Sequence, residues 1–169
     1  IVLAVSADEL SGLDQRATDA LHDCFLEQSW SFQREIPFSL PIYLLIKDSE
    51  SLPGVGSLSE VVCSLSGTET TIGWSSPYLP DSVFSAEWVE EAFIALKKQL
   101  SGVISNALKS ECPVGSGDLL VGAASISSLE PDVERFFESV FASPKLITPP
   151  MLRGIYLSVC EIQPAGQRA

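Results

Sequence analysis

A short apolar run from Ile42 to Ile46 constrains the fold of this chain more than any other feature. It is too short for an ordinary helix and is followed directly by charged residues. Such a run predicts a strand buried on both faces, typical of the centre of a parallel sheet. Ligands of open α/β sheets bind just beyond the carboxyl ends of these strands. Lys47, Asp48 and Glu50 occupy that position and are therefore the first candidates for a small-molecule site.

The apolar patterns elsewhere predict strands alternating with helices. Strands are expected at 1–5, 42–46, 119–125 and 151–159. Helices are expected at 13–33, 58–65 and 131–141, and the longest from 82 or 85 to 109. Residues 68–80 are predicted to be a loop with room for a short extended piece. The strand at 151–159 alternates in polarity, which favours a position near a sheet edge.

This order predicts the α/β class, with three layers and a mostly parallel sheet covered by helices on both faces. The segments near residues 3, 44 and 122 are expected to lie side by side in this sheet and to run in the same direction. Residues 1–162 are expected to form a single domain, and 163–169 the beginning of a linker. Because the sequence starts inside an apolar run without an initiating Met, we expect it to be part of a longer chain.

The composition argues against two classes of partner. The formal net charge is −12, and the ten basic residues are scattered. Nucleic-acid affinity depends on Lys and Arg that neutralise phosphates, so no nucleic-acid partner is expected. No apolar stretch approaches the roughly 20 residues that cross a bilayer, so direct membrane insertion by this segment is not expected either.

The cysteines indicate a reducing compartment, and their spacing does not predict a metal site. Cys24, Cys63, Cys112 and Cys160 lie far apart, and the single histidine, His22, cannot complete a common zinc set. Two disulfides remain an alternative, but a chain of this length can build a core without them. Four reduced thiols in a reducing, cytoplasmic compartment are the preferred interpretation.

No catalytic motif is present. The sequence has no phosphate-binding Gly-x-x-x-x-Gly-Lys-Ser/Thr, no Gly-x-Gly-x-x-Gly, no Gly-x-Ser-x-Gly and no His-Glu-x-x-His. Asp8 and Glu9 are interpreted as helix-entry residues, and Glu90 and Glu91 as a solvated helix face, because adjacent helix residues point about 100° apart. We expect no catalytic residue, no metal site and no enzyme activity from this segment alone.

Several stretches together resemble the IcmF/TssM family of secretion-system inner-membrane proteins. They are Ile1–Leu10, Pro41–Ile46 with Leu52-Pro53-Gly54, Gly73-Trp74, and Pro150-Met151-Leu152-Arg153-Gly154-Ile155-Tyr156. The last of these is similar to the family's Pro-Leu-Leu-Arg-Gly-Val-Tyr signature. The order and spacing also match over nearly the whole chain.

The resemblance implies a partial P-loop-GTPase-like fold, namely the C-terminal half of the family's cytoplasmic GTPase-like domain. The family's Thr/Asn-Lys-x-Asp base-recognition motif falls on Lys47, Asp48, Ser49 and Glu50. Asp48 then replaces the lysine and Glu50 the aspartate that accepts hydrogen bonds from guanine, which implies a degenerate pocket. Ser125 falls on the family's weak base-contacting loop, at the end of the strand expected at 119–125.

The signature residues Leu152, Arg153, Gly154 and Tyr156 are expected to be structural, stabilising an edge strand. By resemblance, the segment is a non-catalytic structural and docking module on the cytoplasmic face of the bacterial inner membrane. It would contact other inner-membrane and baseplate components of a secretion system, type VI being favoured over type IVB.

The alternative is a nucleotide-binding switch. It would use GTP or ATP with Mg²⁺ only if an upstream half carries the phosphate-binding loop. A phosphoacceptor receiver domain is a more distant option, since the acidic cluster it needs is missing.

Overall fold

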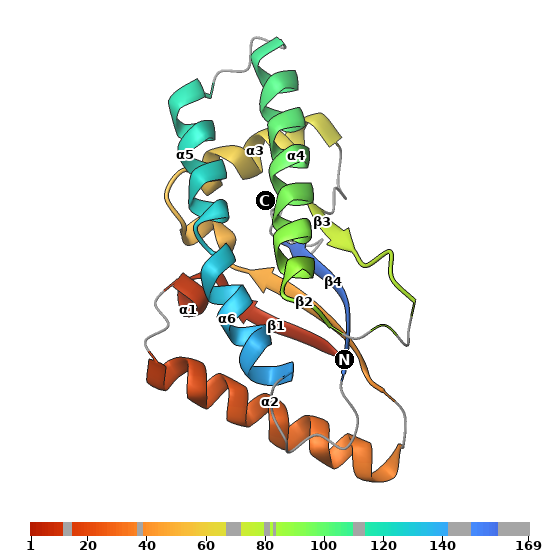
Figure 1. Ribbon diagram of the computed structural model, residues 1–169. Helices are drawn as coiled ribbons and strands as arrows, with labels where there is room; N and C mark the ends of the chain where they lie inside the picture. Colours follow the sequence, from red (N-terminus) through yellow and green to blue (C-terminus); the bar gives the residue numbers. More distant parts are fainter. Residues whose placement is uncertain are drawn as a thin grey trace, which may run out of the picture.

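The computed structural model describes residues 1–11, 15–36, 39–66, 72–79, 82, 84–109, 114–141 and 150–158 (Figure 1). The strands are β1 (Val2–Ser6), β2 (Pro41–Lys47), β3 (Ile72–Ser75) and β4 (Met151–Leu157). The helices are α1 (Ala7–Ser11), α2 (Gln15–Glu35), α3 (Val55–Ser66), α4 (Glu87–Lys109), α5 (Ser116–Ser127) and α6 (Glu130–Phe141), with a 3-10 turn, η1 (Ser49–Ser51).

The sheet is mixed. Its order is β1-β2-β4-β3, with β1, β2 and β4 parallel and β3 antiparallel to β4. The predicted α/β class is confirmed, and β1 and β2 lie side by side as expected. The position of β4 was predicted wrongly, because it lies between β2 and β3 rather than at an edge.

The predicted strand at 119–125 is wrong, since these residues belong to helix α5. The buried residues of α5 are Leu119, Gly122 and Ile126, which recur at helical spacing, whereas Leu120 and Val121 are exposed. β4 therefore occupies the place beside β2 that was expected for residues 119–125.

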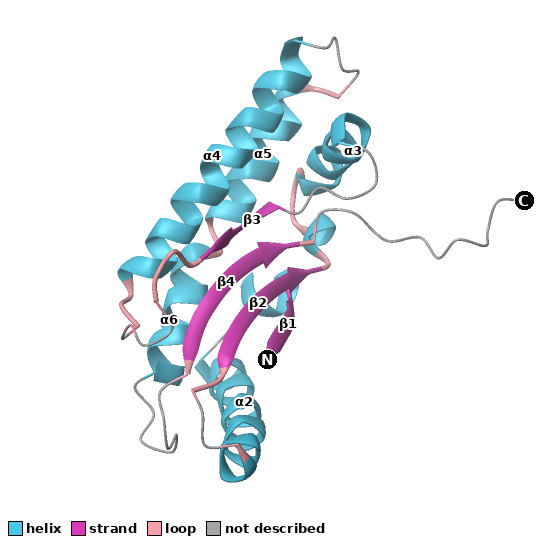
Figure 2. Cartoon of the chain, turned by 90° about the vertical axis from the view of Figure 1, so that its right-hand side faces the viewer, coloured by secondary structure: helices cyan, strands magenta, loops and turns pink. Residues whose placement is uncertain are grey.

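Strand β2 is buried on one face only, which corrects a second prediction. Ile42, Leu44 and Ile46 are fully buried, while the alternating Tyr43 is 36 % exposed. No helix crosses in front of β2 and β4 in Figure 2. Among the described residues the helices cover one face of the sheet, so the predicted three-layer arrangement is not found there.

The core lies between this buried sheet face and helices α4 and α6. An apolar stripe along α4 is buried, and it includes Trp88, Phe93, Leu96 and Leu100. The predicted long helix is confirmed at this stripe. The helices predicted around residues 13–33, 58–65 and 131–141 are also confirmed, as α2, α3 and α6.

Candidate functional site

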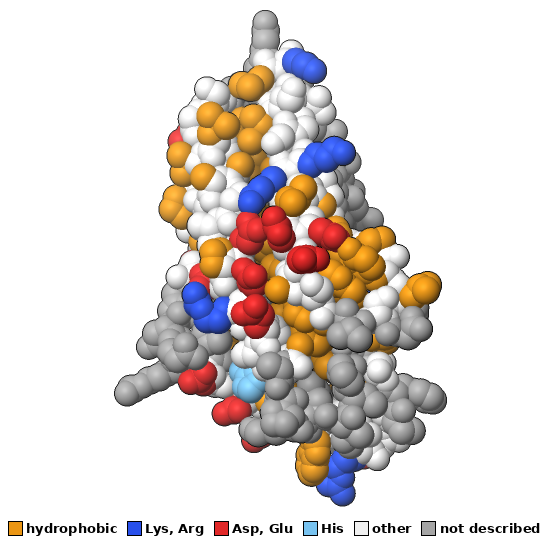
Figure 3. Space-filling model, in the orientation of Figure 1, with side chains coloured by type: hydrophobic (Ala, Val, Ile, Leu, Met, Phe, Trp, Pro, Cys, Tyr) orange, Lys and Arg blue, Asp and Glu red, His pale blue; other side chains and the backbone are white. Residues whose placement is uncertain are grey.

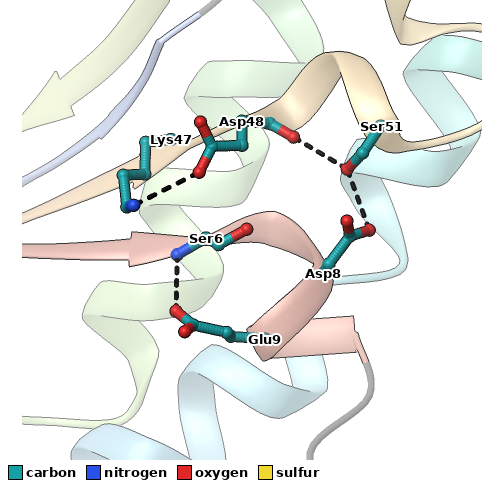
Figure 4. A network of polar contacts seen from close by, with 6 residues as sticks. All are labelled: Ser6, Asp8, Glu9, Lys47, Asp48 and Ser51. Atoms are coloured by element: carbon teal, nitrogen blue, oxygen red, sulfur yellow. Dashed lines mark hydrogen bonds and ion pairs between the residues drawn. The ribbon is translucent and has the colours of Figure 1, made fainter.

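The candidate site lies where β1 and β2 end. Ser6 pairs with Lys47 in the parallel register, so the segments that follow both strands leave the sheet at the same edge. The following segments are α1 and η1, and their polar side chains form a network around Ser6, Asp8, Glu9, Lys47, Asp48 and Ser51 (Figure 4). The candidate residues Lys47, Asp48 and Glu50 lie at this edge of the sheet, where the sequence predicts a ligand.

Asp48 turns the chain from β2 into η1. Its φ of 54° and ψ of 31° lie in the left-handed region, which is uncommon for any residue except glycine. The Nζ of Lys47 lies 3.3 Å from the Oδ2 of Asp48. Both side chains are about half exposed, so this ion pair stabilises the loop by at most about 1 kcal/mol.

Ser51, on η1, links this turn to helix α1. Its Oγ lies 2.8 Å from the Oδ1 of Asp8 and 2.8 Å from the carbonyl oxygen of Asp48, so its single proton serves one acceptor at a time. On the other loop, the amide of Ser6 donates to the Oε2 of Glu9 over 3.1 Å. The carboxylates of Asp8 and Glu9 therefore accept hydrogen bonds from the protein itself. In the described part of the chain no group of three or more His, Cys, Asp or Glu side chains could hold a metal ion.

Ser49 and Glu50 differ in their surroundings. Ser49 is fully buried, and its Oγ donates to the carbonyl oxygen of Ser158 over 2.6 Å. This bond ties the start of η1 to the end of β4. Glu50 is exposed on the same turn. The two acidic members of the resembling base-recognition motif, Asp48 and Glu50, are therefore both exposed.

Ser125 does not lie at a strand end, which corrects its predicted placement. It lies on α5, and its Oγ donates to the carbonyl oxygen of Pro53 over 2.9 Å. Ser125 thus reaches the loop that follows β2, but as a helix residue packed against that loop. Ser125 therefore lies near the segment that carries Glu50, but it comes from a helix and not from a strand end.

A close contact between two glycines holds this loop on α5, and sequence analysis missed it. Gly54 has a φ of +76°, and a Cβ on Gly54 would lie 2.5 Å from the backbone nitrogen of Gly122. A Cβ on Gly122 would equally lie 2.5 Å from the carbonyl oxygen of Gly54. Only glycine at both positions lets the two backbones approach this closely.

The signature residues lie on the internal strand β4. Arg153 is the extra residue of an irregularity in the pairing, since Ile42 pairs with Leu152 and Tyr43 with Gly154. Such a bulge redirects a side chain. Here the Nη1 of Arg153 donates to the carbonyl oxygen of Tyr78 over 2.6 Å.

Tyr78 continues this contact towards α4. Its hydroxyl donates to the Oε1 of Glu91 over 2.6 Å, and its ring stacks on Trp88 with 4.3 Å between centroids. The hydrogen bond to the Glu91 carboxylate raises the pKa of Tyr78 above its usual value, with smaller contributions from burial and from the charges of Glu91 and Glu87. The signature arginine thus connects β4 to the start of α4 through the segment after β3.

Tyr156 covers the backbone of two strands on the open sheet face. A Cβ on Gly154 would lie 2.5 Å from the Tyr156 ring, so glycine is needed for the ring to lie there. The Tyr156 hydroxyl shares a 2.7 Å hydrogen bond with Ser75, and its ring stacks with Tyr43 at 6.4 Å between centroids. Leu152, by contrast, is fully buried in the core. These contacts link β2, β4 and β3.

The cysteine prediction is wrong for one residue. Cys63, on α3, is disulfide-bonded, whereas Cys24, on α2, is a free and exposed thiol. Disulfides are typical of oxidising compartments in most organisms. The inference of a reducing compartment from cysteine usage therefore loses its basis. Across the described ranges, no helix is long and apolar enough to span a bilayer.

The fold and the site define an α/β domain with a mixed sheet and a polar loop cluster at the carboxyl ends of two parallel strands. A family model described as the IcmF-related N-terminal domain matches residues 1–167. The chain therefore belongs to the IcmF-related family, which indicates a component of a secretion system. No curated protein and no solved structure matches the chain.

Proposed function

We propose that this domain is a non-catalytic docking module of a type VI secretion membrane complex. It would lie at the cytoplasmic face of the inner membrane and contact other inner-membrane and baseplate proteins of the system. Family membership supports the secretion setting. The observation that carries the docking role is the apolar sheet face that no described helix covers.

This open face presents aromatic and aliphatic side chains from neighbouring strands. Val2 is 65 % and Tyr43 is 36 % exposed, and Leu45 and Tyr156 are partly exposed beside them. Parallel strands are normally covered on both faces. Exposed apolar surface of this kind marks sites where another protein or segment packs.

The polar loops at the candidate site support docking over nucleotide recognition. Lys47 pairs with Asp48, and the hydroxyl of Ser125 is used by Pro53. Three of the side chains that the resemblance assigns to a base, Lys47, Asp48 and Ser125, are therefore engaged with the protein itself. A guanine would have to displace these contacts before it could be recognised.

The charge distribution also favours a protein partner. In Figure 3 acidic side chains gather in the middle of the face where α4 and α6 lie. Glu130 on α6 pairs with Lys97 on α4 at 2.6 Å. With the net charge of −12, this surface would attract basic protein segments and repel free nucleotides.

The second candidate is a nucleotide-binding switch, in which this chain is the C-terminal half of a GTPase-like domain. One observation favours it: Lys47, Asp48 and Glu50 lie at the carboxyl end of a parallel strand, where α/β folds bind ligands. The left-handed conformation of Asp48 is the kind of backbone strain found at ligand sites. GTP or ATP with Mg²⁺ would then need a phosphate-binding loop from an upstream half.

Replacing Tyr43 by lysine is expected to reduce the amount of protein that co-purifies with the assembled membrane complex by roughly tenfold or more, because an ammonium group would be buried at the contact. The free energy of unfolding should change by no more than about 0.5–1 kcal/mol, since Tyr43 is partly exposed and loses one aromatic stack. The matched control is Ser105→Lys, on the exposed side of α4. Equal recovery of the two variants would contradict the docking role of the sheet face.

A further inference from the structure

A cavity lies beside the edge strand β1. It has a volume of about 310 Å³ and is lined by residues 1–4 together with α2 side chains that include Phe25, Ser29 and Phe32. Pockets of this size accommodate a ligand or a partner's side chain. Because its lining includes four consecutive residues, Ile1 to Ala4, the cavity lies along the start of β1.

The backbone of β1 is unpaired along this cavity. The amide of Tyr43 donates to the carbonyl oxygen of Ile1 over 2.9 Å, so the odd-numbered residues of β1 bond to β2. In a parallel ladder the alternate residues, here Val2 and Ala4, direct their amide and carbonyl groups away from β2. In the described chain no other strand pairs with β1. At Ser6 the outward amide is already taken by Glu9.

β1 also lacks the features that keep an edge strand from pairing. Natural edges are usually blocked by a charged residue, a proline or a bulge. The strand Val-Leu-Ala-Val-Ser contains no charge or proline, and its register with β2 is regular. The edge from Val2 to Ala4 is therefore chemically ready to accept another strand.

A buried hydroxyl group in the cavity has no partner. Ser29 is 1 % exposed, and its Oγ makes no hydrogen bond with the described residues. Leaving a buried donor and acceptor unsatisfied is costly, so such a group calls for a ligand that bonds to it. Its α2 neighbours Phe25 and Phe32 supply apolar walls.

Acidic residues lie near the cavity. Asp23 and Glu27 precede the cavity-lining residues Cys24 and Gln28 on α2, and all four are exposed. Glu9, on α1 after the carboxyl end of β1, is also exposed. This arrangement is complementary to a segment with basic residues on either side of an apolar stretch.

We propose that the edge of β1 and its cavity bind an extended segment of a different protein by strand addition. The segment would place apolar side chains at alternate positions, a hydrogen-bonding side chain against Ser29, and basic residues near Glu27 and Glu9. Main-chain hydrogen bonds to Val2 and Ala4 supply affinity and the cavity supplies specificity. This proposal rests on the docking function above and locates a second contact at the edge of the sheet, on the strand next to Tyr43.

The test places the photo-crosslinking residue p-benzoylphenylalanine at Val2 of the full-length protein in cells. We expect a crosslink to one extended segment of another polypeptide, mapped by mass spectrometry, at a yield about tenfold above the same probe at Lys98 on α4. Ala4→Pro should lower this yield roughly tenfold, because it removes an outward amide and leaves the donors to β2 in place. Ala4→Val keeps the amide and should leave the yield within about twofold.

Three results would overturn the proposal: crosslinks only within the same polypeptide, crosslinks only to a second copy of this protein, or no yield above the Lys98 control. A fourth result, a crosslink yield that is the same with and without Ala4→Pro, would overturn it as well. Because Val2 borders the sheet face, the effect of Ala4→Pro decides between the two: it removes an edge amide that packing on the sheet face does not use, so the Tyr43→Lys assembly assay can succeed while the Ala4→Pro effect is absent. The two proposals are therefore separable.

Ser29→Ala is an independent test, because it should raise the melting temperature and lower the crosslink yield. The melting temperature of the unbound protein should rise, because an unsatisfied buried hydroxyl is removed. The crosslink yield at Val2 should fall by about two- to tenfold, because the partner loses a hydrogen bond. Ser31→Ala, at an exposed position of the same helix, should change neither. A higher melting temperature with an unchanged crosslink yield would mean that Ser29 does not contact the partner and would contradict the proposal.

Discussion

Replacing Gly54 by alanine is expected to lower the free energy of unfolding by about 2–5 kcal/mol. Part of this cost is conformational, because a φ of +76° disfavours any residue with a Cβ. The rest is steric, since that Cβ would lie 2.5 Å from the carbonyl oxygen of Asp118 and 2.5 Å from the nitrogen of Gly122. Both atoms are helix backbone and cannot rotate away. Urea unfolding followed by circular dichroism measures the loss.

Gly102→Ala is the matched control for this prediction. Gly102 is an exposed residue inside α4, and a Cβ there would meet nothing within 4 Å. Alanine should stabilise the helix by about 0.5–1 kcal/mol. If Gly54→Ala were as harmless as Gly102→Ala, the loop after β2 would not be packed on α5, and the description of the candidate site would be wrong.

The second large effect is expected at Phe137. Truncating it to alanine should cost about 3–5 kcal/mol of unfolding free energy, because it leaves a cavity in the core. Phe137 is fully buried on α6, with its ring centroid 5.4 Å from Phe136 and 6.2 Å from Phe84. These rings join α6 to the segment that precedes α4. The same urea unfolding measurement applies.

Leu120→Ala is the control for Phe137, since Leu120 is 61 % exposed on α5. Its expected effect is within about 0.5 kcal/mol. A loss below about 1 kcal/mol for Phe137→Ala would contradict its place in the core, because buried aromatic truncations cost several times more.

The sequence pattern predicted the secondary structure correctly for segments whose own residues determine it. The apolar run at 42–46 predicted β2, and the apolar stripe after residue 82 predicted α4. The alternation at 151–159 correctly indicated a strand, and β4 was found there. The stripe of α4 and the alternation of β4 carry a periodicity that fits one secondary structure, and the run at 42–46 was assigned by its short length and its charged and Pro-Gly flank.

The sheet was harder to predict because its arrangement depends on distant segments. Leu119, Leu120 and Val121 form a short apolar run that is compatible with either a strand or a helix. The helical spacing of Leu119, Gly122 and Ile126 is the signal that could have identified α5. Without it, β4 was assigned to the edge, and β3 remained a loop with a possible extended piece.

The candidate site was predicted in part for the same reason. Adjacent residues after a strand end, such as Lys47 and Asp48, are placed by the strand itself. The contact of Ser125 with Pro53 depends on how α5 packs, which no local pattern encodes. The unpaired edge of β1 likewise becomes visible only once the strand order is known.

The central claim, that this domain docks proteins and does not recognise guanine, is tested most directly by titrating labelled GTP into the full-length protein. Glu50→Ala is the informative variant, and Glu60→Ala, exposed on α3, is its control. We predict that neither substitution changes GTP binding by more than about twofold, because the docking account gives Glu50 no contact with a base. Tight GTP binding that is lost in Glu50→Ala and kept in Glu60→Ala would contradict the account.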